Sequence, residues 1–155
     1  MTTLPQHEDI DLPMVLEEVL ASASQGRAAA TRLRYARVHA HLLLFLDRVD
    51  VRGPLGLQVA AALEVERDVG REGAFFRRLG VHELLTCLPL FLGPGWLAVR
   101  TVERRAQVRF VALLLRRLEQ VDGLEPRTRV RAIGVLREAL AAVRAGRDVE
   151  LDHGQ

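Results

Sequence analysis

Few residues of this chain have the type and spacing that catalysis requires. Cys87 is the only cysteine and lies in an apolar stretch, where burial disfavours the reactive thiolate. His39 and His41 are two residues apart, so on a helix they point to nearly opposite sides and cannot share a metal ion. His82-Glu83 lacks the second histidine of the zinc-protease motif. We therefore expect a protein that is not an enzyme and that has no metal site and no cofactor.

Arginine is the residue type whose arrangement indicates binding. All 22 basic residues are arginine, although the formal net charge is only +2. Residues 100–147 carry twelve arginines against five acids, whereas residues 1–26 carry five acids and no arginine. A very GC-rich coding sequence would also produce such usage, so the positions of the arginines carry more information than their number. A basic body is thus bracketed by acidic ends, which can fold back onto it or repel competing polyanions.

The long helix expected over residues 96–121 carries a basic stripe. Arg105, Arg109 and Arg116 fall within about 40° of each other at the helical repeat. Arg104 lies to one side of this stripe, and the opposite face is apolar. Such a helix can pack against a core on one face and present guanidinium groups to phosphates on the other.

Three further arginines open the last helix. Arg127, Arg129 and Arg131 lie near its start, where positive side chains oppose the helix dipole. A phosphate there would satisfy both the exposed backbone N–H groups and the guanidinium groups. The alternative is a solvated arginine face paired within the chain with acids such as Glu119 and Glu125.

Two segments resemble a known family. Residues 101–110, TVERRAQVRF, are similar to a helix of the core-binding domain of tyrosine recombinases and phage integrases. Residues 31–35, TRLRY, followed by Phe45-Leu46, resemble the first helix of that domain. The resemblance implies an all-helical module that grips one face of duplex DNA. The contacts that it implies are made by Arg32, Arg34, Arg104, Arg105 and Arg109. No Arg…His-x-x-Arg…Tyr set is present, so we do not expect strand cleavage.

The apolar pattern is helical nearly throughout and predicts an all-α fold, a single compact bundle of five to seven helices. The expected helices cover about 12–20, 27–49, 57–69, 74–79, 81–92, 96–121 and 126–143, with glycine or proline between them and Asp11 as the expected N-cap of the first. Two apolar stripes on residues 27–49 predict a central helix that is covered from two sides. The domain is expected over residues 11–146. An acidic N-terminal segment over 1–10, a candidate for disorder, precedes it, and an acidic tail over 147–155 follows it.

The most apolar stretch, Leu84–Val99, predicts buried core. It contains Pro89 and the Gly93-Pro94-Gly95 break, whereas a membrane-spanning helix needs roughly twenty uninterrupted apolar residues. We expect no membrane association. With one cysteine and no signal peptide at its start, the chain is expected in the cytoplasm.

Two functions remain open at this point. The first is a non-catalytic protein that contacts duplex DNA, or another polyanion, mostly through its phosphates and with low sequence specificity. The alternative is a self-associating scaffold with no nucleic-acid role, for which Leu42–Leu46 or Leu88–Leu92 would form a homodimer contact.

Overall fold

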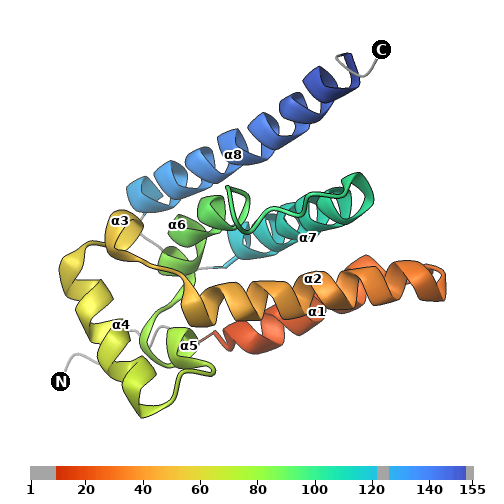
Figure 1. The fold of residues 1–155 in the computed structure, drawn as a ribbon. Helices are drawn as coiled ribbons and strands as arrows, with labels where there is room; N and C mark the ends of the chain where they lie inside the picture. Colours follow the sequence, from red (N-terminus) through yellow and green to blue (C-terminus); the bar gives the residue numbers. More distant parts are fainter. Residues whose placement is uncertain (1–9, 122–125, 153–155) are drawn as a thin grey trace.

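The computed structural model describes residues 10–121 and 126–152, with side chains as far as residue 146. These ranges contain eight helices and no strand (Figure 1), so the all-α prediction is confirmed. The helices are α1 (Leu12–Ser24), α2 (Ala29–Arg48), α3 (Arg52–Leu55), α4 (Leu57–Val69), α5 (Ala74–Arg78), α6 (Val81–Phe91), α7 (Thr101–Glu119) and α8 (Pro126–Asp152). The number exceeds the expected five to seven because the glycine-proline break at residues 52–55 itself forms one helical turn.

The first two helices form a hairpin that packs against α7 (Figure 1). Asp11 caps α1 as expected, since its Oδ1 accepts a hydrogen bond of 3.1 Å from the backbone N–H of Met14. On α1, the side chains of Leu12, Val15 and Leu16 are buried. An exposed pair, Arg117 Nε to Glu18 Oε2 at 3.4 Å, joins the outer edges of α7 and α1.

The prediction that α2 is covered from two sides is wrong. Tyr35, Val38 and Leu42 are buried, but Leu33 on the other stripe is 53% exposed and Ala40 is exposed as well. The helices that pack most extensively on α2 are α1, α5 and α7, with Phe91 of α6 against its end, and together they bury only one of its faces. The periodicity showed which positions share a face and did not show which face meets another helix.

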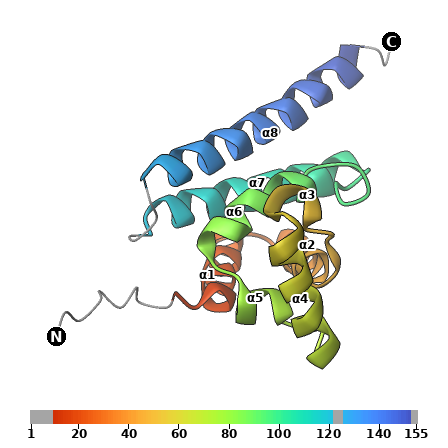
Figure 2. The ribbon, with the colours of Figure 1, turned by 90° about the vertical axis from the view of Figure 1, so that its left-hand side faces the viewer.

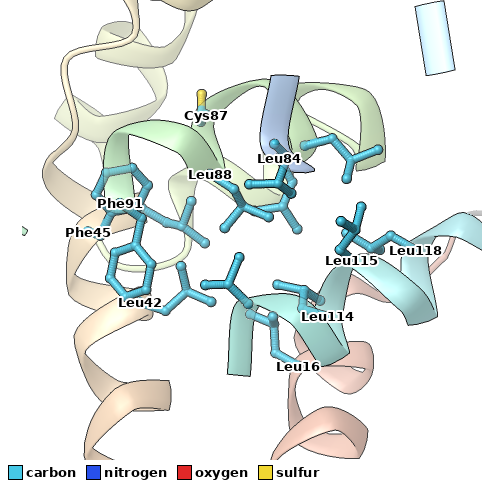
Figure 3. Packing of buried hydrophobic residues seen from close by; sticks show 14 of the residues in the cluster. Leu16, Leu42, Phe45, Leu84, Cys87, Leu88, Phe91, Leu114, Leu115 and Leu118 are labelled. Atoms are coloured by element: carbon cyan, nitrogen blue, oxygen red, sulfur yellow. The ribbon is translucent and has the colours of Figure 1, made fainter. Parts of the chain in front are cut away.

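The core is centred on α6, which Figure 3 shows among α2, α7 and α8. Leu84, Leu88 and Phe91 are completely buried, so the predicted core assignment is confirmed over α6. The stretch ends outside the core, because Val99 is 86% exposed. The helix continues through Pro89 to Phe91. Pro89 has no N–H to donate to the carbonyl four residues earlier, so α6 continues through it with one hydrogen bond fewer and ends two residues later.

The last helix packs mainly against α6 and only secondarily against α7. Its buried residues, among those whose side chains are described, are Ala132, Ile133, Leu136 and Leu140. The expected end near Gly146 is wrong, because α8 continues to Asp152. Glycine inside a helix lowers stability by only about 1 kcal/mol and does not by itself end it. The first six residues of the expected acidic tail therefore belong to α8, and residues 1–9 of the expected acidic N-terminal segment lie outside the described residues.

The stretches expected to form a dimer contact are largely used within the chain. Leu42 and Leu46 are completely buried, as is Leu88, while Leu44 and Leu90 are 39% and 41% exposed. Among the described residues, none of the helices combines the length and the apolarity that crossing a membrane demands.

Cys87 provides a test of the core. Its thiol is completely buried, and this burial, with a smaller contribution from Glu83, raises its pKa to about 12. We expect thiol reagents to react slowly with the native protein at pH 8 and rapidly after unfolding in urea, because almost no thiolate is present or accessible in the fold. Labelling followed by mass spectrometry measures both rates. Fast labelling of the native protein would contradict the position of α6.

Candidate nucleic-acid interface

A groove lies between α7 and α8. In Figure 2 the two ribbons separate toward the C-terminal end of α8. The groove has a volume of about 340 Å³ and an apolar part formed by Val108, Ala112, Leu113 and Val143. The remaining lining residues are all arginines, namely Arg104, Arg105, Arg109, Arg116 and Arg144. No carboxylate is among the residues that line it. The groove therefore concentrates positive charge next to an apolar surface.

Four of these arginines are available to a ligand. The side chains of Arg105, Arg109, Arg116 and Arg144 are exposed, and none has a carboxylate partner within the part of the chain that the structure describes. Arg104 differs, because its Nε donates to the carbonyl of Ala98 at 3.0 Å and its Nη2 to that of Val99 at 3.2 Å. Arg104 thus supports the loop before α7 while it lines the groove.

The start of α7 is set by the buried side chain of Gln107, which is 1% exposed. Its Nε2 donates to the carbonyls of Phe91 at 2.9 Å and Trp96 at 3.1 Å, and its Oε1 accepts from the N–H of Ala98 at 2.9 Å. The prediction of a helix from Trp96 is therefore wrong: α7 begins at Thr101, because backbone groups of the preceding segment bond to side chains of α7.

A ring cluster holds the same loop from the side of α2. His41 Nε2 lies 2.7 Å from the carbonyl oxygen of Trp96. The His41 ring centroid is 5.3 Å from that of Phe91 and 5.4 Å from that of Trp96, and Phe45 lies 5.1 Å from Trp96. These contacts give His41 a structural role. Within residues 10–121 and 126–146, no group of three or more histidine, cysteine or acidic side chains is placed to hold a metal ion.

His39 also has a structural role, in the contact between α2 and α7. Burial lowers the pKa of its imidazole, while Glu17 acts in the opposite direction. Its ring centroid lies 6.3 Å from that of Phe110. Because the folded pKa is below the unfolded one, protonation of His39 works against folding as the pH falls below about 6.5.

The structure brings together Arg104, Arg105, Arg109 and Arg116, four of the nine arginines predicted to bind. Arg127, Arg129 and Arg131 lie in the first turns of α8, about 20–25 Å from Arg144 along the helix axis. Arg32 is exposed and Arg34 half-buried on the first half of α2, outside the groove.

Sequence reasoning missed Arg144 as part of the site. Its position in the groove follows from the pairing of α7 with α8, for which the local sequence gives no signal. Pairing within the chain, the alternative to binding, does occur for other arginines: Arg137 Nη2 lies 2.5 Å from Glu119 Oε1, and Arg117 pairs with Glu18.

Comparisons with known proteins do not extend this description. No protein-family model, no curated protein and no solved structure matches the chain. The resemblance of residues 101–110 and 31–46 to the core-binding domain of tyrosine recombinases therefore stays a prediction.

Gln107 can be tested by replacement with leucine, which has a similar size and no hydrogen-bonding groups. We expect Gln107→Leu to lower the free energy of unfolding by about 2 kcal/mol, because the Phe91 carbonyl and the Ala98 N–H lose their partner, while the Trp96 carbonyl keeps only its contact with His41. Urea unfolding followed by circular dichroism measures the change. The matched control is Gln120→Leu at the exposed end of α7, for which we expect a change within about 0.5 kcal/mol. Equal stability of the two variants would show that Gln107 does not hold the loop.

Proposed function

We propose that the protein is a non-catalytic, cytoplasmic protein that binds duplex DNA through the arginine groove between α7 and α8. The observation that carries the proposal is the gathering of five arginines around one groove with no carboxylate in its lining. Such an arrangement raises the local positive potential and favours a partner with closely spaced negative charges. Phosphates accept the fork of donors that a guanidinium group presents.

The length of the arginine stripe suits a nucleic acid better than a single small anion. Arg105 and Arg116 are eleven residues apart, which corresponds to about 16 Å along α7. A duplex of that length carries roughly ten phosphate charges, so several guanidinium groups can be neutralised together. The resemblance of residues 101–110 to a DNA-gripping helix of tyrosine recombinases supports the same partner.

The other predicted arginines have a secondary place in this proposal. Arg127, Arg129 and Arg131 start α8 at the far end from Arg144, and Arg32 and Arg34 lie on α2. A duplex longer than the groove would pass beyond its ends and meet such flanking charges. Contacts of this kind neutralise phosphates and do not read bases, so low sequence specificity is expected.

Charge reversal in the groove tests the proposal. We expect wild-type protein to bind an unrelated duplex at low salt and to bind it much more weakly at a higher salt concentration. In Arg105→Glu with Arg109→Glu, two neutralising charges become repelling ones, and we expect affinity to fall by about a hundredfold or more. Fluorescence anisotropy with a labelled duplex measures both effects.

The control variant is Arg37→Glu with Arg78→Glu, which changes the net charge equally. Both residues are exposed, and neither lines the groove. It should retain affinity within a few fold, because general repulsion by the whole protein is weaker than the loss of direct contacts. Absence of wild-type binding even at low salt, or equal losses in the two variants, would overturn the proposal.

A second candidate function, self-association, is favoured by one surface. On α4, Leu57, Val65 and Val69 are 75%, 67% and 83% exposed, and exposed Ala61 continues the same stripe at four-residue spacing. This apolar face replaces the stretches on α2 and α6 that the sequence suggested for a dimer contact. Exposed apolar stripes of this kind often mark contacts between proteins.

Sedimentation of the protein at high micromolar concentration tests self-association. If α4 forms a dimer contact, we expect a dimer mass for wild type and a monomer mass for Val65→Glu, since a carboxylate in the contact would lose its hydration. Leu33→Glu, on the exposed side of α2, is the matched control and should leave the mass unchanged. A monomer mass for wild type would remove this candidate.

A further inference from the structure

A second hollow lined by arginines lies where the end of α2, α3 and the start of α4 meet. Its volume is about 440 Å³. The charged residues in its lining are Arg48, Asp50, Arg52, Glu64, Arg67 and Arg71. Four cations against two carboxylates leave a formal charge of +2 in this small space. No residue lines both this hollow and the groove between α7 and α8.

Both carboxylates are already engaged. Asp50 Oδ2 accepts from Arg52 Nη2 at 2.6 Å and from Arg52 Nε at 3.0 Å. Glu64 Oε1 accepts from Arg67 Nη1 at 2.8 Å. The other two arginines in the lining have no carboxylate partner in the described ranges. Arg71 makes one long hydrogen bond, 3.4 Å, to the carbonyl of Asp47, and Arg48 is exposed.

Arg67 fixes positive charge in the wall of the hollow. It is 5% exposed, and its Nη2 donates to the carbonyl of Leu46 at 3.0 Å. Its Nε is buried and has no acceptor among the residues that the structure describes. The carboxylate that faces it belongs to Glu64, whose side chain is 57% exposed and therefore screened by water. A buried cation with so little compensation favours the approach of an anion.

We propose that this hollow binds the phosphate dianion of a small molecule. A phosphate group carries about −1.5 to −2 charge near pH 7, which matches the two arginines left without carboxylates. Arg48 and Arg71 would bind its oxygens directly, and Arg67 would supply a fixed positive potential. The volume lies within the range of small-molecule sites, so an organic group on the phosphate can lie against Val51 and Ala60. The proposal is independent of DNA binding in the groove.

Titration calorimetry with inorganic phosphate and with ribose 5-phosphate tests the proposal, with potassium chloride holding the ionic strength constant. We expect saturable binding of one equivalent per chain by wild type. In Arg48→Gln with Arg71→Gln the dissociation constant should rise at least about tenfold, because two charge-assisted contacts are lost. Arg105→Glu with Arg109→Glu is the control and should bind the same ligand as wild type does.

The two ligands distinguish a phosphomonoester from free inorganic phosphate as the group that the hollow binds. Tighter binding of ribose 5-phosphate than of inorganic phosphate identifies a phosphomonoester as the ligand, and equal binding identifies free phosphate. No saturable binding of either ligand, or equal loss in the hollow and groove variants, would overturn the proposal. Circular dichroism checks that both variants fold, and Arg48→Gln alone, at an exposed position, should give an intermediate loss. Failure here with normal duplex binding would leave the groove proposal intact.

Discussion

The buried amide of Gln107 is the interaction on which the position of the groove depends. The segment between α6 and α7 contains Gly93-Pro94-Gly95, and its turns satisfy only part of its backbone groups, such as the N–H groups of Trp96 and Leu97. Gln107 bonds to two of them, the Trp96 carbonyl and the Ala98 N–H, and to the Phe91 carbonyl at the end of α6; His41 also contacts the Trp96 carbonyl from the side of α2. These hydrogen bonds hold the side chain of Gln107 against the preceding segment, and they therefore fix the rotation of α7 about its own axis. The direction in which Arg105 and Arg109 project follows from a glutamine on the opposite side of the helix.

The groove also depends on which helix α8 packs against. Leu136 and Leu140 of α8 are buried, and α8 packs mainly against α6. The distance between α8 and α7 therefore increases toward the C-terminal end of α8 (Figure 2). Closer packing on α7 would have covered Ala112 and Leu113, which are half-buried, and brought Arg144 against Arg109. Like charges that approach in a low-dielectric contact repel strongly, so the divergence lets both helices keep their arginines hydrated. The same divergence leaves the apolar part of the groove open.

Local sequence predicted the local features and missed those set by distant contacts. The limits of α4 and the Asp11 cap were predicted because glycine, proline and capping residues act within a few positions. The stripe of Arg105, Arg109 and Arg116 followed from the helical repeat alone. The late start of α7 at Thr101 was missed because it depends on hydrogen bonds from Gln107. Arg144 was missed because only the pairing of α7 with α8 brings it to the groove.

A chain whose only fixed cation is arginine cannot be interpreted by counting arginines, and the partners of each guanidinium group carry the information instead. Arg67 and Arg137 are paired with carboxylates, and Arg104 donates to backbone carbonyls of a loop, so these guanidinium groups already have partners within the fold. A compositional bias alone would scatter the rest among acids over the surface. In the groove, four exposed arginines instead share one lining without a carboxylate, so their mutual repulsion is not relieved within the described chain. An arrangement of that kind lowers the stability of the protein alone and is relieved when an anion binds.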